Sequence, residues 1–265
     1  MEIRGKAGVV TGAGSGIGRA VSIRLAHEGA SIVVADIDEA DGAETVKQIE
    51  SAGGKAVFVR ADVTKESDAR RMLDSAVQKY GRLDILHNNA GIGVGAPGFP
   101  LADPARWHLV IEIDLQAVIL GTGLAASIME KGGGGAIVNT ASMAGLYPHR
   151  QDAVYGAAKA GVVNFTHSLA FWEQDKKIRV NCVCPGIVDT PLVRRGLEQA
   201  QAHGMKSWMP SKIIQPEEIA DAVYSLVRDD SLYGCSLEVR PTGRQIVDPR
   251  PAPGSRPSTH AGFKS

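Results

Sequence analysis

The hydrophobic pattern of the chain alternates between two kinds of segment. Short runs of apolar and β-branched residues predict buried strands at 7–11, 31–36, 56–61, 83–87, 136–141, 178–184 and 236–239. Longer stretches between them have helical spacing and predict helices at 17–28, 39–52, 67–80, 104–130, 153–172 and 216–228. Strands that alternate with helices form a parallel sheet that is covered on both faces. We therefore predict an α/β fold with a doubly wound parallel sheet of about seven strands, flanked by helices on both faces.

A glycine-rich turn follows the first predicted strand and opens the first predicted helix. It reads Thr11-Gly12-Ala13-Gly14-Ser15-Gly16-Ile17-Gly18, so its last glycines depart from the Gly-x-Gly-x-x-Gly spacing. Glycines at such a turn let the backbone approach a pyrophosphate, and the helix N-terminus faces the phosphate charge. The alternative is a glycine-rich surface turn without a ligand. The predicted dinucleotide contacts here are Gly12, Ser15, Gly16, Ile17 and Gly18.

Asp36 ends the second predicted strand, about 20 residues beyond the glycine turn. At that place a carboxylate can accept hydrogen bonds from both ribose hydroxyls of NAD. A 2'-phosphate would meet its negative charge, and neither Ser15 nor Ile37 offers a cation to offset it. The sequence therefore favours NAD over NADP. The alternative interpretation of Asp36 is an ordinary cap of the following helix.

Polar and small residues follow the third and fourth predicted strands. Asp62 and Val63 come after the third strand, and Asn89, Ala90 and Gly91 follow the fourth within Asn88-Asn89-Ala90-Gly91. The carboxyl ends of parallel strands line the cleft in which α/β sheets bind ligands. An asparagine turn before a glycine is also ordinary turn chemistry, but its position favours a binding site.

A tyrosine and a lysine stand one helical turn apart in Tyr155-Gly156-Ala157-Ala158-Lys159, and Ser142 ends the strand before them. A free tyrosine titrates near pH ~10, so a phenol that accepts a proton at neutral pH needs a nearby cation to stabilise the phenolate. Ser142 is placed to meet the Tyr155 hydroxyl over the edge of the sheet. This set provides a base, its activator and a hydrogen-bonding partner for a substrate oxygen. The alternative is one amphipathic and one solvated residue on an ordinary helix.

Composition narrows the classes of partner. Lysine plus arginine equals aspartate plus glutamate, 29 each, so no global field attracts nucleic acid or an acidic membrane. We expect small molecules or copies of the chain itself as partners. The cysteines Cys182, Cys184 and Cys235 lack Cys-x-x-Cys spacing and are expected to be buried thiols, not metal ligands. No apolar run approaches the ~20 residues that span a bilayer, and residues 1–6 lack a signal-peptide core, so we expect a cytoplasmic protein.

Taken together, these motifs resemble the classical short-chain dehydrogenase/reductase family over roughly residues 5–240. The family motif Thr-Gly-x-x-x-Gly-x-Gly matches Thr11, Gly12, Gly16 and Gly18, and Asn-Asn-Ala-Gly matches residues 88–91. The family serine matches Ser142, Tyr-x-x-x-Lys matches Tyr155 and Lys159, and Pro-Gly matches Pro185-Gly186. Five motifs in the family's order are far more specific than any single one.

The resemblance implies a single Rossmann-type domain and a role for each matched residue. Tyr155 would be the general acid or base, Ser142 would hold the substrate oxygen, and Lys159 would bind the nicotinamide ribose and lower the pKa of Tyr155. Asp62 and Val63 would contact the adenine, and Asn89 would stabilise the central strands and line the cofactor site. The remaining implied cofactor contacts, at the nicotinamide end, are Pro185, Gly186, Ile187 and Thr190.

One position departs from the family pattern. Family members commonly have an asparagine in the helix after the fourth strand, holding a water that connects the lysine to solvent, whereas this chain has Asp114. A carboxylate can still hold that water, and it would also offset part of the Lys159 charge. We therefore count Asp114 among the catalytic residues and expect a less acidic Tyr155 and a higher pH optimum. The alternative is that Asp114 simply tolerates the position.

The substrate region is expected over the site, in the segments 93–101, 144–151 and 187–212. The last segment contains an apolar set compatible with a lid, and core packing or a dimer contact is the alternative. Its members are Leu192, Val193, Met205, Trp208 and Met209.

Assembly and the C-terminus complete the predicted organisation. Small residues in the helices at 104–130 and 153–172 let helices approach closely, and in the family such helices form the contacts of dimers and tetramers. We therefore expect a homotetramer or homodimer through Ala125, Ala126, Ala157, Ala160 and Gly161. Residues 1–245 are predicted to form the catalytic domain. The proline-rich residues 246–265 are predicted to form a tail, either exposed or packed on a neighbouring subunit.

The sequence thus predicts an NAD-dependent oxidoreductase for a modest-sized, fairly apolar secondary alcohol or ketone. Two alternatives stay open. The first is an NADPH-dependent 3-oxoacyl-type ketoreductase, against which Asp36 argues. The second is a non-catalytic dinucleotide-binding sensor or scaffold, which has no need for Ser142, Tyr155 and Lys159 together.

Overall fold

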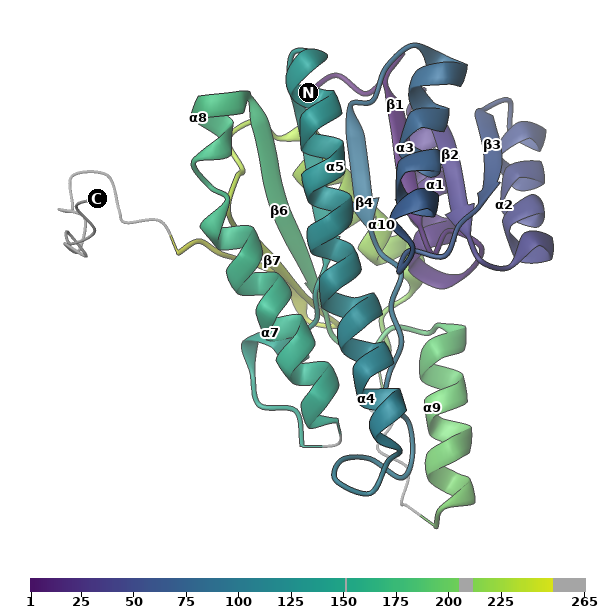
Figure 1. Ribbon diagram of the computed structural model, residues 1–265, viewed down its shortest axis with the longest axis vertical. Helices are drawn as coiled ribbons and strands as arrows, with labels where there is room; N and C mark the ends of the chain where they lie inside the picture. Colours follow the sequence, from purple (N-terminus) through teal and green to yellow (C-terminus); the bar gives the residue numbers. More distant parts are fainter. Residues whose placement is uncertain (151, 205–211, 250–265) are drawn as a thin grey trace, which may run out of the picture.

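The computed structural model describes residues 1–150, 152–204 and 212–249, which form one eight-stranded sheet with helices on both sides (Figure 1). Its strands are β1 (Ala7–Thr11), β2 (Ser31–Asp36), β3 (Lys55–Arg60), β4 (Ile85–Asn88), β5 (Gly135–Thr140), β6 (Ile178–Pro185), β7 (Ser236–Arg240) and β8 (Gly243–Val247). The order across the sheet is β3-β2-β1-β4-β5-β6-β7-β8. The first seven strands pair in parallel, which confirms the predicted doubly wound sheet.

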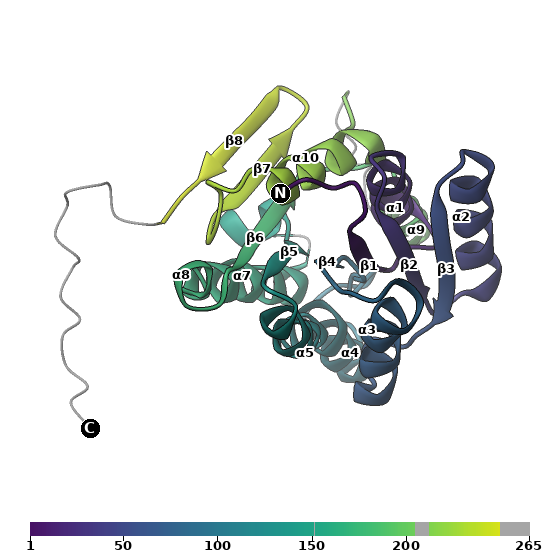
Figure 2. The same cartoon turned by 90° about the horizontal axis from the view of Figure 1, so that it is seen from above.

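The helices lie in two layers. They are α1 (Gly16–His27), α2 (Glu39–Ser51), α3 (Glu66–Tyr80), α4 (Pro104–Ile111), the π-helix η1 (Glu112–Gln116), α5 (Ala117–Lys131), α6 (Met143–Leu146), α7 (Ala153–Ser168), α8 (Trp172–Lys176), α9 (Pro191–Ala202) and α10 (Pro216–Arg228). Seen from above, α1 and α10 cover one face of the sheet, whereas α3, α5 and α7 cover the other (Figure 2).

Both faces of the central strands are buried because consecutive side chains point to opposite layers. Val10 and Val34 belong to the apolar cluster beneath α1 and α10, whereas Val9 and Val33 belong to the cluster beneath α3 and α5. All four side chains are fully buried. This packing explains why the strands are uninterrupted apolar runs.

The predicted helix at 104–130 is continuous, but its middle turn is the π-helix η1. By length and hydropathy alone, the 28-residue stretch Pro104–Lys131 could cross a membrane, so the expectation of no such run was wrong. The stretch is instead a core helix of this fold, because Val118, Ala125 and Met129 are buried against the rest of the domain. A buried helix can be as apolar as a membrane span.

Elsewhere, the helix after β5, the segment 187–212 and the C-terminus also differ from the prediction. The predicted helix at 153–172 is interrupted, since α7 ends at Ser168 and α8 begins at Trp172. Within the segment expected as a loop, Thr190 caps the new helix α9 and Pro191 occupies its first turn. The first residues of the predicted tail form part of β8, which pairs antiparallel with β7. The rest of the tail, from residue 250, lies outside the described residues.

Several small residues expected between subunits serve packing within the chain. Ala125 and Ala126 are buried in the core, and a Cβ on Gly161 would lie 2.9 Å from the Leu115 side chain. Ala157 and Ala160 are exposed on α7. The three cysteines are buried, as expected.

Candidate active site

The glycine turn between β1 and α1 has a conformation that only glycine accommodates. Gly12 and Gly16 have φ values of 61° and 51°, in the left-handed region that other residues avoid. A Cβ on Gly18 would lie 2.1 Å from the Gly12 carbonyl oxygen. Asn89 Nδ2 donates to the carbonyl oxygens of Thr11 (3.0 Å) and Gly12 (3.2 Å), so the residue after β4 fixes the turn after β1. The result is a tightly packed backbone cradle at a helix N-terminus, a geometry that suits a pyrophosphate.

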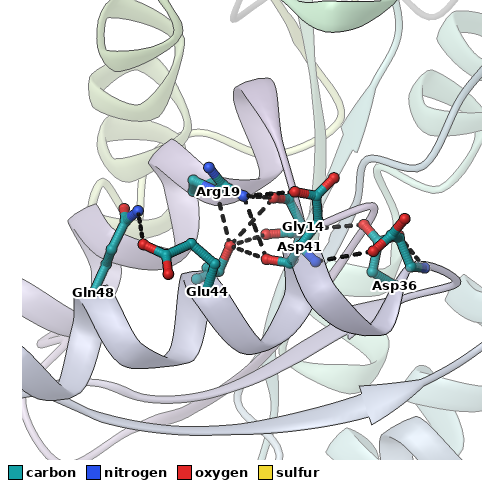
Figure 3. A network of polar contacts seen from close by, with 9 residues as sticks. Gly14, Arg19, Asp36, Asp41, Glu44 and Gln48 are labelled. Carbon is teal, nitrogen blue, oxygen red and sulfur yellow. Dashed lines mark hydrogen bonds and ion pairs between the residues drawn. The ribbon is translucent and has the colours of Figure 1, made fainter.

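Asp36 faces this turn from the end of β2 (Figure 3). Its carboxylate accepts hydrogen bonds from the backbone N–H groups of Gly14 (2.7 Å) and Asp38 (3.0 Å). Asp38, and not Asp36, caps α2 through the N–H of Asp41, so the interpretation of Asp36 as the helix cap was wrong. Asp36 therefore holds its carboxylate at the outer rim of the cradle, where a ribose would lie in a bound dinucleotide.

Arg19, which no sequence motif singled out, is a cation one turn into α1 that reaches the same region (Figure 3). Its Nε donates to Thr45 Oγ1 at 3.0 Å, and its Nη2 donates to the Gly14 carbonyl oxygen and lies 3.3 Å from Asp41 Oδ1. Arg19 therefore ties the glycine turn to α2, and its charge is already compensated by Asp41.

The other predicted cofactor residues lie along the same edge of the sheet. Asp62 Oδ1 accepts from the Thr64 hydroxyl (2.7 Å) and N–H (3.0 Å). Thr190 packs beside the glycine turn, since a Cβ on Gly16 would lie 3.1 Å from Thr190 Cγ2. Ile37 stays 58% exposed and available for stacking. Val63 and Ala90 border one small cavity. Pro185 ends β6, and the next two residues, Gly186 and Ile187, are hydrogen-bonded through their backbones to β7 and to Ile214, respectively.

Lys159 connects three groups of the candidate catalytic cluster. Its Nζ donates to the Thr140 carbonyl oxygen at 3.0 Å and lies 3.0 Å from Asp114 Oδ2. The same Nζ lies 5.6 Å from the centroid of the Tyr155 ring. Asp114 and Lys159 are both buried, so the ion pair is shielded from water.

Local structure sets the positions of these side chains. Ser142 caps α6 by accepting from the Ala144 N–H at 3.1 Å, which holds its hydroxyl at the end of β5. Tyr155 occupies the first turn of α7, one turn before Lys159. Asp114 belongs to η1, and π-turns often occur at functional sites because they redirect a side chain. Its Oδ1 accepts from the Ile92 N–H at 2.8 Å.

Comparisons with known proteins identify the family of this chain. The family model described as short chain dehydrogenase matches residues 6–201. The chain belongs to the short-chain dehydrogenase/reductase family. It is 42% identical over 229 residues to cis-4-hydroxycyclohexanecarboxylate dehydrogenase of Sinomonas cyclohexanicum, covering 85% of this chain and 90% of that protein. It is 36% identical to cyclohexanol dehydrogenase of Acinetobacter sp. (strain SE19), covering 88% and 91%.

Solved structures agree with the family assignment. The crystal structure of 3-ketoacyl-(acyl-carrier-protein) reductase from Brucella melitensis complexed with NADH superposes with a TM-score of 0.80 at 30% identity. The superposition covers 89% of this chain and 97% of the other. This short-chain dehydrogenase/reductase is therefore an NAD(P)-dependent oxidoreductase that acts on CH–OH groups.

The electrostatics of the cluster are set by burial and by the Asp114–Lys159 pair. Burial raises the pKa of Tyr155, the Lys159 ammonium opposes this, and the Asp114 carboxylate adds to it. A hydrogen bond with Ser142 also lowers the pKa of Tyr155. Burial lowers the pKa of Lys159, but the charges of Asp114 and Tyr155 together leave that pKa raised. Lys159 thus acts on Tyr155 in the predicted direction, while burial makes the net shift upward.

Asp114 gives the first testable prediction in this short-chain dehydrogenase/reductase. Asp114→Asn removes a negative charge beside Lys159, so the phenolate of Tyr155 becomes more stable and its pKa falls. Because alcohol oxidation needs the deprotonated tyrosine, the pH profile of kcat/KM should move to lower pH by about one unit. Steady-state rates across pH measure the shift, and Glu112→Gln, a charge change on the same π-turn, is the control. An unmoved profile would show that Asp114 merely fills its position.

The described parts of the predicted substrate segments lie at the lower end of the molecule in Figure 1, near α4, α7 and α9. Gln199 of α9 lies against Gly95, where a Cβ would approach Gln199 Oε1 to 2.5 Å. The His149 ring meets the Tyr155 ring edge-on, with centroids 6.1 Å apart. Leu192 and Val193 belong to α9, whereas the predicted lid residues Met205, Trp208 and Met209 lie outside the described residues.

Proposed function

We propose that this protein is an NAD-dependent dehydrogenase of small apolar secondary alcohols, with six-membered ring alcohols as its substrate class. The observation that carries the proposal is the cluster of the buried Lys159 with the partly buried Tyr155 and Ser142, together with Asp36 beside the glycine turn. The names of two relatives, a cyclohexanol dehydrogenase and a hydroxycyclohexanecarboxylate dehydrogenase, support the substrate class.

The described residues fit a nicotinamide dinucleotide. Added Cβ atoms at Gly12 and Gly18 would collide with Ala90 and with the Gly12 carbonyl oxygen, so only glycines permit this tight turn at the N-terminus of α1, where a phosphate would bind. Asp36 would accept from the ribose hydroxyls of NAD and repel a 2'-phosphate, and Arg19 offers no free charge to offset this because it is paired with Asp41. We propose that Asn89, Ala90, Gly91, Asp62 and Val63 line the site. When bound, the cofactor supplies the hydride acceptor.

The side chains of this protein transfer the hydroxyl proton of the substrate. Tyr155 takes the hydroxyl proton of the alcohol, and the reverse transfer serves ketone reduction. Ser142 holds the substrate oxygen against the Tyr155 hydroxyl. Lys159 stabilises the phenolate and is itself kept charged by Asp114. Positioning contributes in addition, because Ser142 at the start of α6 and Tyr155 on α7 would hold one substrate oxygen between them.

The rival functions differ in cofactor and in turnover. A 3-oxoacyl-type reductase would use NADPH and a linear thioester, whereas a sensor or scaffold would bind the cofactor without turnover. We therefore suggest measuring ketone reduction with cyclohexanone and with an acetoacetyl thioester, each with NADH and NADPH. The proposal predicts the highest kcat/KM for cyclohexanone with NADH. A preference for the thioester with NADPH supports the first rival, and binding without turnover of either substrate supports the second.

We further propose that the enzyme is a cytoplasmic homotetramer or homodimer. The small exposed residues Ala157 and Ala160 on α7 support close packing against a second copy. Sedimentation of the purified protein measures the mass of the assembly.

A further inference from the structure

The segment 92–94, between β4 and α4, is held by charged side chains instead of by a neighbouring strand. The N–H of Ile92 donates to Asp114 (2.8 Å), and the N–H of Val94 donates to Asp152 Oδ2 (2.8 Å). Arg106 of α4 donates through Nη2 to the Gly93 carbonyl oxygen at 2.8 Å. Hydrogen bonds with charged partners are the stronger kind, so this segment is fixed from three separate elements.

Each of the two carboxylates also contacts one candidate catalytic residue, Asp114 through a side chain and Asp152 through the backbone. Asp114 pairs with Lys159 at 3.0 Å. Asp152 caps α7, because its Oδ1 accepts from the backbone N–H of Tyr155 at 2.9 Å. One oxygen of Asp152 thus holds the residue that carries the phenol, and the other holds Val94 of the substrate segment.

We propose that Asp152 is a positioning residue, which fixes the substrate segment at Val94 in its position relative to the general base Tyr155. Through this bridge, the wall of the substrate pocket and the proton acceptor move together. The inference rests on the proposed function for Tyr155 but concerns a residue outside the family motifs matched above. A simple helix cap would need only one of the two oxygens.

A serine at position 152 tests separately whether the residue caps α7 and whether it bridges α7 to Val94. Asp152→Ser keeps an oxygen that can cap α7, but its side chain is too short to reach Val94 as well. The matched control is Asp103→Ser, because Asp103 caps α4 through the Ala105 N–H (2.9 Å) without a second contact of this kind. Asp152→Asn is a second variant, because an amide keeps the size of the side chain but offers only one accepting oxygen.

The proposal predicts that Asp152→Ser lowers kcat/KM for cyclohexanol about tenfold, the loss expected for one hydrogen bond to a charged group. The KM for NAD should stay within about twofold, because no cradle contact changes. The pH profile should move to lower pH, since the Asp152 charge disfavours the phenolate. The other polar groups acting on Tyr155, namely Lys159, Asp114 and Ser142, remain in the variant. Asp103→Ser should change none of these quantities.

Amide hydrogen exchange provides a readout that needs no turnover. In Asp152→Ser, the Val94 amide should exchange about tenfold faster, while the Ile92 amide, bound to Asp114, stays protected. Unchanged exchange at Val94, or an unchanged kcat/KM in a folded variant, overturns the inference. If the wild-type enzyme oxidises no alcohol, the proposed function fails, and the exchange at Val94 alone then decides whether Asp152 makes the bridge.

Discussion

Tyr155→Phe is expected to lower kcat for alcohol oxidation by roughly 10²–10⁴-fold, the contribution of one positioned general base. The substitution removes a single oxygen from a partly buried ring that keeps its contact with His149. Ser142 and Lys159 cannot replace this oxygen, because a serine hydroxyl is a poor base and the pKa of the lysine is raised by Asp114. The measurement is the rate of NADH formation at saturating NAD and alcohol.

A matched control is Tyr224→Phe. Tyr224 is a partly buried tyrosine of α10, away from the candidate site, whose hydroxyl donates to Glu28 Oε2 at 3.2 Å. Removal of that hydroxyl should leave kcat nearly unchanged. Fluorescence titration should show that Tyr155→Phe still binds NADH. A Tyr155→Phe enzyme that keeps more than about a tenth of the wild-type kcat would contradict a role as general base.

Asp36→Asn is expected to reverse much of the preference for NAD. Hydrogen bonds to a charged group contribute about 1.5–3 kcal/mol, so kcat/KM for NAD should fall by roughly 10–100-fold. For NADP, kcat/KM should rise, because the 2'-phosphate no longer meets a carboxylate. Asp38→Asn, which makes the same change at the cap of α2, is the control and should alter neither value. An unchanged NAD/NADP ratio in Asp36→Asn would place the source of cofactor choice elsewhere.

The alternation of apolar strands and helices predicted the sheet because a strand buried on both faces must be apolar throughout. The seven parallel strands follow directly from that rule. The antiparallel strand β8 could not be predicted, because its residues Arg244 and Gln245 are exposed and polar at the edge of the sheet. The break after Ser168 was hidden for a similar reason, since apolar side chains continue through Leu169 and Trp172.

The candidate site was likewise predicted from the sequence only in part. Local motifs predicted the groups that carry chemistry, because the glycine turn and the Tyr155–Lys159 spacing are properties of one segment each. The direct ion pair of Asp114 and Lys159 depends on a π-turn, which no sequence spacing reports. The bridge made by Asp152 depends on a contact 58 residues away along the chain. The signal for it was weak: an aspartate just before a predicted helix, which is also the ordinary signature of a cap.

The most direct test of the account is the formation of NADH by the purified protein with cyclohexanol as the alcohol. The account predicts turnover with NAD that exceeds turnover with NADP, and that is lost in Tyr155→Phe but retained in Tyr224→Phe. Absence of NADH formation from cyclohexanol and related ring alcohols, by a folded protein that binds NADH, would contradict the central claim.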